Sequence, residues 1–338
     1  MIARKTLRGL AAWLALAYTV GVVSPVEGYL KFGTRIGDRI VSLRWNRIPV
    51  RYVVGDLGVV GVSADQLQGA VDRAFRTWEA LETSDIRFEF AGVTSAAAVQ
   101  GDGVSTLGFT NRPDLDRVLG QTSFFIDTRS GEILEADIFF NSAFQWSVAP
   151  GGEPDRFDLE SVALHEIGHL LGLGHSAIGE TELRPEGGRR VLAAGAVMFP
   201  IAFTAGNISA RELKPDDMAG ASDLYPNGAL RGRTGSMSGR VTKNGGAVFG
   251  AHVIAFNLQT AALVAGFSVE SDGGFTVGSL DPGVYIVRVE PIDDASVESF
   301  FSDAARVDVD FLVSYYERLV IVPGGGGTDR LEVKVTGK

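Results

Sequence analysis

The chain of 338 residues contains no cysteine. This absence excludes a disulfide framework and a metal site with thiolate ligands. An exported protein of this length without disulfides fits a bacterial product better than an animal extracellular one, although a large core can also be stable without cross-links. The length itself favours about two domains, each with its own hydrophobic core.

Basic residues are outnumbered. The chain has 31 lysines and arginines against 41 aspartates and glutamates, which gives a formal net charge of −10. Because binding to phosphate groups needs clustered basic side chains, this balance argues against a nucleic-acid partner. We interpret the excess of acidic residues as a solvated acidic surface.

No apolar run is long enough for a comfortable membrane span. Near the N-terminus, three basic residues precede an apolar run of 14 residues, Leu10 to Val23, which has the length of a signal-peptide core. We therefore predict a signal peptide over residues 1–28, cleaved after Gly28. The protein is then expected to be secreted or periplasmic, with no stable membrane span. An uncleaved N-terminal membrane anchor is the alternative.

The segment that follows mixes strand and helix patterns. Short strands are predicted at residues 48–54, 86–90, 122–127 and 135–141, the last two joined by a turn at Ser130-Gly131. Three helices are predicted: one opened by the capping box of Ser63 and Gln66, one capped by Asp155 or Asp158 and running to about Leu171, and one from Pro215 to about Tyr225.

Beyond Tyr225 the sequence changes character. Residues 227–235 are rich in turn formers and form the predicted linker between two domains. Short β-rich runs then recur between Met237 and Val289, separated by turn sequences such as Asn244-Gly245-Gly246. Short strands at this spacing indicate an all-β sandwich over residues 236–338.

Residues 165–175 carry the metal-binding pattern, and they read His-Glu-Ile-Gly-His-Leu-Leu-Gly-Leu-Gly-His. On a helix, His165 and His169 lie on one face and can present their imidazoles to a single ion. Gly172 can end the helix with a positive φ, after which His175 can return as a third ligand. Three histidine ligands leave one tetrahedral position open, which distinguishes a catalytic zinc site from a closed structural one.

Glu166 follows the first histidine and projects beside the metal, not onto it. In this position its carboxylate can take the proton of a zinc-activated water and pass it to the leaving amine. The motif therefore predicts an exported zinc-dependent endopeptidase with Glu166 as the general base.

The motif resembles the signature of the metzincin metallopeptidases, H-E-x-x-H-x-x-G-x-x-H followed by a Met-turn. The candidate Met-turn is Ala196-Val197-Met198-Phe199-Pro200. The resemblance implies that Met198 forms a hydrophobic floor beneath the zinc without binding it. Ser176, directly after the third histidine, is similar to the residue at this point in the matrixin (matrix metalloproteinase-like) group.

The resemblance to matrixins extends over about residues 40–226. It implies an α+β zincin-like catalytic domain over residues 29–226, with a mixed twisted sheet and an active-site helix. A protein or peptide substrate would bind in an extended groove. Residues 136–141 resemble the matrixin edge strand that pairs with substrate.

The chain also departs from the matrixin pattern. Without cysteine there can be no cysteine-switch propeptide, and only a short stretch between Gly28 and Trp45 is left for an inhibitory prodomain. No histidine precedes His165, so the histidine-bound structural zinc of animal matrixins is not expected. Matrixins usually carry tyrosine two residues after the Met-turn proline, where this chain has Ala202.

Calcium is a further cofactor that the loops could hold. Asp102-Gly103 and residues 114–116 offer oxygen ligands, although aspartate in loops is also ordinary turn chemistry.

The C-terminal segment resembles the carboxypeptidase regulatory-like, transthyretin-like β-sandwich. The resemblance rests on Ser238 to Val241, Ala251 to Asn257, Gly273 to Phe275 and Leu280 to Tyr285. It implies an accessory domain that stabilises the enzyme or docks it to substrate or a cell surface. His252 is interpreted as an ordinary strand residue.

Two other classes of function remain open. The chain could be a zinc-binding adhesion or matrix module whose peptidase site is inactive, or a zinc hydrolase acting on a non-protein bond. Zinc binding without hydrolysis of any peptide would indicate the first, and a closed pocket in place of an extended groove would indicate the second.

Overall fold

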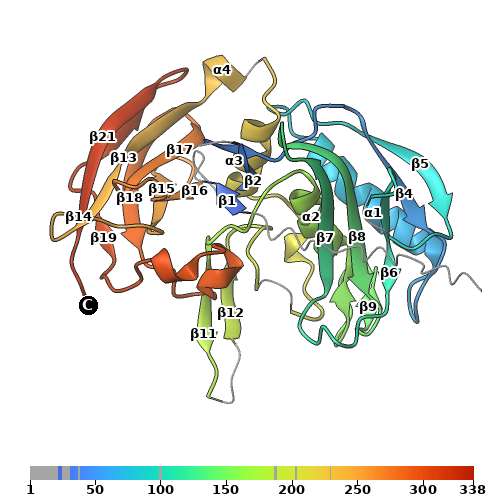
Figure 1. Cartoon of the computed structure of the whole chain (residues 1–338). Coiled ribbons are helices and arrows are strands. Elements are labelled where there is room, and N and C mark those ends of the chain that lie inside the picture. Colours follow the sequence, from blue (N-terminus) through green and yellow to red (C-terminus); the bar gives the residue numbers. More distant parts are fainter. Residues whose placement is uncertain are drawn as a thin grey trace, which may run out of the picture.

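The computed structural model describes residues 22–24, 31–36, 39–98, 101–185, 189–201, 204–228 and 230–338. The predicted signal peptide and its cleavage point at Gly28 lie outside these residues, apart from the short strand β1 (Val22–Ser24). A helix-containing region (residues 39–228) and a strand-rich region (residues 235–338) lie side by side (Figure 1). One cluster of buried apolar side chains runs through both of them.

A five-stranded sheet forms one layer of the helix-containing region. Its strands are β4 (Val50–Gly55), β5 (Phe88–Thr94), β6 (Ser105–Thr110), β7 (Gly120–Asp127) and β8 (Glu132–Asn141), in the order β5-β4-β6-β8-β7. Only β7 runs antiparallel to its neighbour. Four strands confirm the predicted ones, whereas β6 was not predicted because its sequence, STLGFT, shows no clean alternation.

The edge strand of this sheet corrects one expectation. Residues 136–141 were expected to form the edge, but they lie in β8, which pairs with β6 on one side and β7 on the other. The strand that ends the sheet on this side is β7. A central strand has no unpaired backbone groups to offer to a substrate, so β7 is the strand whose edge is available.

The three main helices confirm the predicted ones. They are α1 (Ala64–Glu79), α2 (Leu159–Leu170) and α3 (Pro215–Leu224). The Ser63 hydroxyl accepts from the Gln66 amide while the Gln66 side chain accepts from the Ser63 amide, which is the predicted capping box. Asp158, not Asp155, caps α2.

Several short elements accompany the main sheet and the three helices. Strands β2 (Lys31–Ile36) and β3 (Arg39–Ser42) form a small sheet with β1, and β9 (Trp146–Ser147) pairs with β10 (Phe157–Asp158). The hairpin of β11 (Gly179–Leu183) and β12 (Arg189–Ala194) projects away from both regions (Figure 1). A short 3-10 turn, η1 (Ser209–Arg211), precedes α3.

The strand-rich region consists of two sheets. One has the order β14-β13-β17, with β21 also paired to β13, and the other has the order β16-β15-β18-β19, with β20 also paired to β18. The bounds are β13 (Gly235–Lys243), β14 (Gly246–Ala247), β15 (His252–Asn257), β16 (Leu263–Phe267), β17 (Gly274–Leu280), β18 (Gly283–Glu290), β19 (Ser314–Tyr315), β20 (Val320–Val322) and β21 (Gly327–Val335). Every strand predicted between Met237 and Val289 is present, at slightly different bounds.

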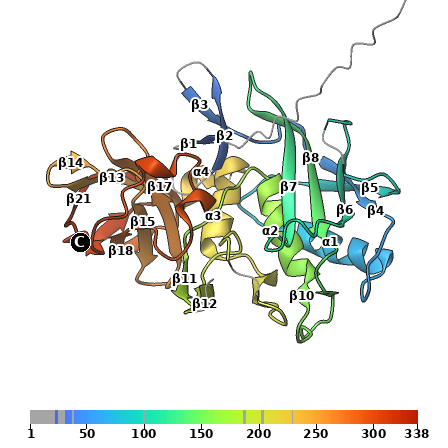
Figure 2. The ribbon, with the colours of Figure 1, turned by 60° about the horizontal axis from the view of Figure 1, so that its bottom comes forward.

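The junction between the two regions is compact. The predicted linker contains the short helix α4 (Leu230–Arg233) and leads directly into β13. Helix α3 packs against β16 and β17, so the chain returns to touch the helix-containing region after leaving it. Two 3-10 turns, η2 (Val297–Ser299) and η3 (Ala304–Arg306), follow β18. Figure 2 shows the two regions from another side, with α3 again at their junction.

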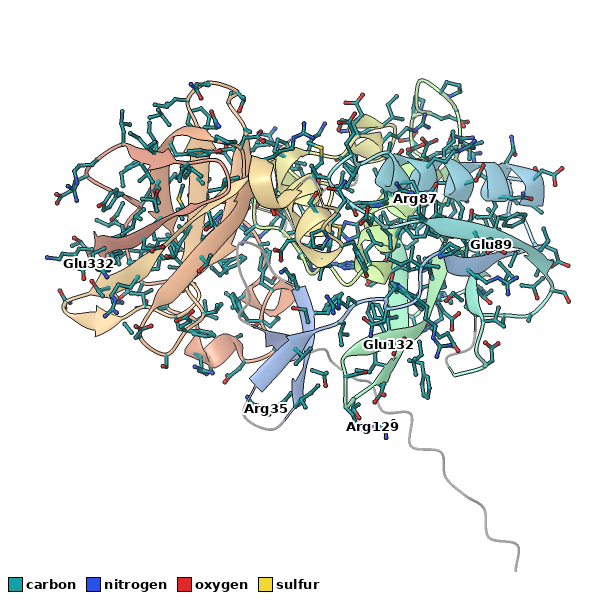
Figure 3. The ribbon with its side chains drawn as sticks, turned by 90° about the horizontal axis from the view of Figure 1, so that it is seen from above. Arg35, Arg87, Glu89, Arg129, Glu132 and Glu332 are labelled. Atoms are coloured by element: carbon teal, nitrogen blue, oxygen red, sulfur yellow. The ribbon has the colours of Figure 1, made fainter. Side chains whose placement is uncertain are left out.

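Several charged side chains point outward from the molecule (Figure 3). Arg35, Arg87, Glu89, Arg129 and Glu332, labelled there, are all exposed. Within the part of the chain that the structure describes, no helix is long and apolar enough to cross a membrane.

Candidate active site

Helix α2 lies at the centre of the helix-containing region, and all of its residues are buried. A helix buried on every side must satisfy the free carbonyls of its last turn with protein groups. Three aromatic side chains donate hydrogen bonds to carbonyls from the middle of α2 to its C-cap: Trp78 to Leu164 at 2.9 Å, Trp45 to Leu170 at 2.8 Å and Tyr225 to Leu171 at 2.6 Å. These bonds tie α2 to α1, to the segment before β4 and to the end of α3.

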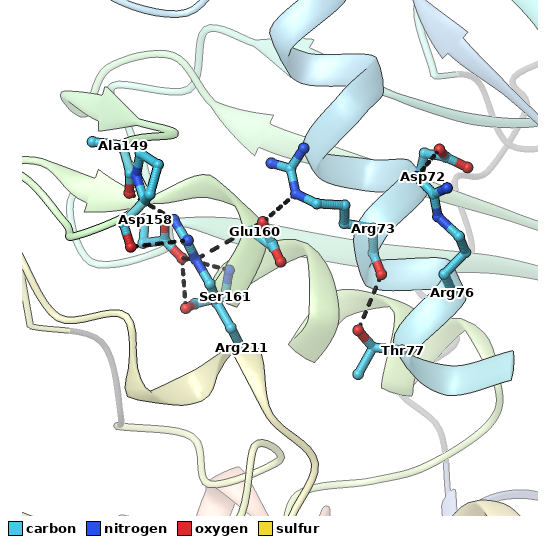
Figure 4. A network of polar contacts seen from close by, with 10 residues as sticks. Asp72, Arg73, Arg76, Thr77, Ala149, Asp158, Glu160, Ser161 and Arg211 are labelled. Carbon is cyan, nitrogen blue, oxygen red and sulfur yellow. Dashed lines mark hydrogen bonds and ion pairs between the residues drawn. The ribbon is translucent and has the colours of Figure 1, made fainter. Parts of the chain in front are cut away.

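The start of α2 is held by a network of ion pairs (Figure 4). The carboxylate of Asp158 accepts from the Ser161 amide at 2.9 Å and pairs with the Arg211 guanidinium at 2.5 Å. Arg73 on α1 donates to Glu160 at 2.6 Å. Because Asp158 and Glu160 are buried, these partners are needed to keep the charges stable, and they lock the helix N-terminus to α1 and η1.

The turn after α2 follows the sequence expectation. Gly172 has a φ of +101°, and a Cβ atom there would come within 2.3 Å of the Leu43 carbonyl oxygen. Only glycine fits both the left-handed backbone and this close approach. The chain then doubles back, and His175 arrives beside the two histidines of the helix.

The structure brings the three predicted histidines together. One ring nitrogen from each of His165, His169 and His175 lies within 4.8 Å of the others. Each Nδ1 atom meets a backbone carbonyl: that of Val197 at 2.7 Å, Leu173 at 2.8 Å and Ser299 at 2.7 Å, in the order of the histidines. A carbonyl oxygen can only accept, so each Nδ1 carries the hydrogen and each neutral ring has its lone pair on Nε2.

Burial keeps these rings neutral. It lowers the pKa of His165 to about 3 and also lowers the pKa values of His169 and His175. Neutral imidazole is the form that binds a metal ion.

The residues present fit a zinc ion. The Nε2 atoms of His169 and His175 lie 3.2 Å apart, with a lone pair on each. Two such lone pairs repel each other unless a cation lies between the rings. Three imidazole nitrogens with one open position are the ligand set of catalytic zinc, and imidazole suits zinc better than the oxygen-preferring cations.

The side chain of Glu166, a residue of α2, reaches the start of the edge strand β7. The Thr122 hydroxyl lies 2.8 Å from its Oε2 atom, and Gly120 comes so close that a Cβ there would be 3.0 Å from its Cγ. Burial raises the pKa of Glu166 to about 7, and the bonds from Thr122 partly oppose this rise. The sequence pattern did not identify Thr122 or Gly120, which no motif marks.

The predicted Met-turn passes beneath the histidine helix. Met198 is buried, and a Cβ on Gly168 of α2 would come within 2.3 Å of its sulfur. The Asp217 carboxylate on α3 accepts from the amides of Val197 and Met198 at 2.8 and 3.0 Å. The Met-turn is therefore fixed between α2 and α3, with Met198 against the helix that carries two of the histidines.

Ser176 and Asp216 join the site to the strand-rich region. The Ser176 amide donates to the Met198 carbonyl at 2.9 Å, and its hydroxyl bonds to the Asp216 carboxylate. The same carboxylate accepts from the Ala265 amide of β16 at 2.8 Å. Burial raises the pKa of Asp216 to about 7, against these hydrogen bonds.

A cleft of about 530 Å³ opens over the three histidines and Glu166. Residues 117–122, which lead into β7 and form its start, contribute to the lining, and Pro200 and Ile201, at the end of the candidate Met-turn and directly after it, line another part. Residues 298–302 of the strand-rich region also line it. This last contribution was not foreseen, because nothing in the sequence links these residues to a site more than a hundred positions earlier.

The remaining candidate residues lie outside this cluster. His252 lies in β15, as predicted, and its Nδ1 is 3.1 Å from a Glu290 carboxylate oxygen. Asp102 accepts from the Val104 amide at 2.8 Å, and Asp114 pairs with Arg112 at 2.7 Å. Calcium in these loops therefore stays a prediction.

Comparison with known proteins agrees with this geometry. The family model described as Matrixin matches residues 44–186 of this chain. The matched span includes the three histidines and Glu166, but it ends before the Met-turn and α3. Matrixins depend on zinc, in keeping with the donor set described above.

The similar curated proteins are metalloendoproteinases and a hatching enzyme. Metalloendoproteinase 1-MMP of Arabidopsis thaliana is 28% identical over 60% of this chain and 50% of its own length. Metalloendoproteinase 2-MMP of the same plant is 34% identical over 36% of this chain and 31% of its own length. The hatching enzyme of Paracentrotus lividus is 26% identical over 57% of this chain and 28% of its own length. The chain thus spans half or less of the length of these relatives.

Proposed function

We propose that this protein is a zinc-dependent endopeptidase. One observation carries the proposal: three neutral imidazoles turn their Nε2 lone pairs toward one point, with the Glu166 carboxylate beside them in the same cleft. A structural zinc site is closed by a fourth protein ligand, whereas among the described residues this cluster contains three. The match to the Matrixin family model and the metalloendoproteinase relatives support the same reaction.

The residues of the chain divide the chemistry between them. His165, His169 and His175 would hold a zinc ion, which would supply Lewis acidity to a substrate carbonyl and to a water molecule. Glu166 accepts the proton of the attacking water and then donates it to the leaving amine. A general base works best with a pKa near the working pH, and burial raises the pKa of Glu166 to about 7. The Thr122 hydroxyl, 2.8 Å from Oε2, holds the carboxylate in place.

The edge strand β7 supports an extended peptide as the substrate. Its first residues, Gly120 to Thr122, line the cleft beside Glu166. An extended peptide can add to such an edge by main-chain hydrogen bonds, which places a peptide bond across the site with little dependence on sequence. A cleft beside an open sheet edge favours a peptide over a small non-protein substrate.

Replacing the proposed base tests this mechanism. Glu166→Gln should lower the hydrolysis rate of a mixed peptide library by about 10²–10⁴-fold, because the proton acceptor is lost. Zinc content, measured by atomic absorption, should stay at one ion per chain. Glu160→Gln is the matched control, since Glu160 lies on the same helix and is also buried, but contacts Arg73 and not the cleft.

Three outcomes of this experiment are informative. Cleavage by the wild type that a zinc chelator abolishes supports the proposal. Glu166→Gln with wild-type rates contradicts the role of the base. Zinc binding by a wild-type protein that cleaves no peptide indicates the alternative, an adhesion or matrix module with an inactive peptidase site.

We also propose that residues 236–338 form a β-sandwich of the carboxypeptidase regulatory-like, transthyretin-like kind, after a catalytic domain that ends near residue 226. Two sheets share one apolar core here, including Met237, Val253 and Val287, which supports a sandwich. Export is part of the proposal and is supported by the basic and apolar sequence of residues 1–28.

A further inference from the structure

The three histidines of the cluster are oriented by backbone carbonyls from two regions of the molecule. His165 and His169 bond to Val197 and Leu173, which belong to the helix-containing region. His175 instead bonds through Nδ1 to the Ser299 carbonyl at 2.7 Å, across 124 positions of sequence. The ring of one candidate ligand is therefore held by the strand-rich region.

The segment that supplies this carbonyl is rigidly built. In η2, the amides of Phe300 and Phe301 both donate to the Val297 carbonyl at 2.9 Å. Both phenylalanine side chains are buried in a cluster with Phe267 and Ile292 of the strand-rich region. Ala177 and Ile201 of the helix-containing region pack against this cluster. The Ser299 carbonyl is thus fixed from both sides of the junction.

The same segment also forms a wall of the cleft. Residues 298–302 line it together with Pro200 and Ile201, and the Phe300 ring lies edge-on to the His175 ring at 6.3 Å. Directly after Pro200 this chain carries Ile201, which packs against the cluster that contains Phe300. Glu298, which is exposed, brings a negative charge to the cleft on this side.

We propose that residues 297–302 of the strand-rich region are part of the active site. Ser299 acts as a positioning residue that holds the His175 imidazole through its backbone carbonyl. Glu298 acts as a specificity residue that favours substrates with a lysine or arginine side chain at this wall. The second role rests on the proposed peptidase function, whereas the first concerns metal binding alone.

A hydrogen bond from the other ring nitrogen holds a metal-bound imidazole in place, and its loss typically lowers metal affinity by about 10–100-fold. Phe300→Leu removes the ring that packs beside His175 and loosens the turn. It should therefore weaken zinc binding by about 10–100-fold in a chelator competition, and alter the visible spectrum of the Co²⁺-substituted protein. Phe311→Leu is the matched control, because Phe311 is also fully buried in the strand-rich region but does not line the cleft.

The comparison of these two variants decides the positioning role. Weaker zinc binding in Phe300→Leu alone supports it. An equal loss of zinc affinity in both variants would overturn it. Unchanged zinc affinity in both variants, at a similar loss of stability, would also overturn it. None of these readouts requires peptide cleavage, so failure of the peptidase function leaves this test intact.

Glu298→Lys tests the specificity role on an exposed residue whose replacement should not disturb folding. Cleavage of a peptide library should shift from basic toward acidic side chains at one position next to the scissile bond, while zinc affinity stays unchanged. A cleavage pattern identical to that of the wild type would refute the assignment of Glu298.

Discussion

The helix-containing region buries many charged groups and the strand-rich region buries none of the acidic ones. Among the described residues of the first region, seven carboxylates are buried: Glu135, Asp137, Asp158, Glu160, Glu166, Asp216 and Asp217. In the second region the buried polar side chains are His252, Asn257 and Ser268. A buried charge is costly unless it is paired or hydrogen-bonded, so such groups persist where they organise a site.

The strand-rich region nevertheless takes part in the site by another route. Beside the side chains of Glu298 and Phe300 at the cleft wall, it contributes two backbone groups, the Ser299 carbonyl on His175 and the Ala265 amide on Asp216. Such groups are present at every residue and carry no charge. The difference teaches that a region with no buried carboxylate among its described residues can still define the geometry of the candidate site.

The largest difference in zinc binding should appear when one histidine of each region is replaced by alanine. His169→Ala removes one of the proposed metal ligands, so zinc binding and peptide hydrolysis should both fall below detection. His252→Ala should keep one zinc ion per chain, because His252 lies in the strand-rich region and bonds to Glu290. Metal analysis of both purified variants checks this. Loss of zinc in His252→Ala would break the contrast between the two regions.

Asp216, on α3 at the junction, should make the coupling of the regions depend on pH. Burial raises its pKa to about 7, whereas in the unfolded chain an aspartate titrates near 3.9. Between about pH 4 and 7 the folded protein therefore keeps a proton that the unfolded chain has lost. The free energy of unfolding should therefore fall as the pH rises through this window. The stability that protonated Asp216 contributes is fully present only below the window.

Asp216→Asn tests this dependence. The amide cannot ionise but still offers an oxygen to the Ala265 amide, so the slope of stability against pH should become flatter. The difference in free energy of unfolding between wild type and variant should change by roughly 2 kcal/mol between about pH 5 and about pH 7. Urea unfolding at these pH values measures it. Parallel curves for the two proteins would contradict the assignment to Asp216.

Two helical glycines should respond to alanine with opposite signs. In Gly168→Ala the new methyl group would come within 2.3 Å of the Met198 sulfur and 3.0 Å of the Trp78 ring, so we expect a loss of about 1–3 kcal/mol in the free energy of unfolding. In Gly69→Ala on α1 the nearest atom is a flexible Arg73 nitrogen at 3.4 Å. Alanine there should stabilise the protein by about 0.5–1 kcal/mol.

Denaturant unfolding of both glycine variants, with zinc affinity measured alongside, checks this pair. Gly168→Ala should also weaken zinc binding, because Met198 lies against the histidine helix. Equal stability changes in the two variants would show that the packing beneath α2 is not as tight as described.

The smallest effect should come from the projecting hairpin. Arg190 on β12 pairs with Glu182 on β11, and both side chains are more than half exposed. Exposed ion pairs contribute about 0–1 kcal/mol, so Arg190→Ala should leave the thermal midpoint and the hydrolysis rate almost unchanged. A marked loss of cleavage in this variant would instead indicate that the hairpin contacts the substrate.

The sequence alone predicted the local features of the site. The spacing of His165, His169 and His175, the left-handed turn at Gly172 and the caps of α1 and α2 follow from helix geometry and short-range sterics, which act over a few residues. Most strands were also predicted, because alternation is a local property as well. Residues 136–141 were wrongly expected to form an edge, since strand order depends on which distant segments pair.

Only the tertiary structure decided what surrounds these residues. It placed Gly120 and Thr122 of β7 against Glu166, and it put the Ser299 carbonyl on His175. These contacts leave no pattern in the sequence, because they depend on the absence of a side chain at Gly120, on a threonine hydroxyl that no motif marks, and on a backbone carbonyl that all residues share. The sequence therefore determined which groups are proposed to perform the chemistry, and the packing of two regions determined how these groups are held.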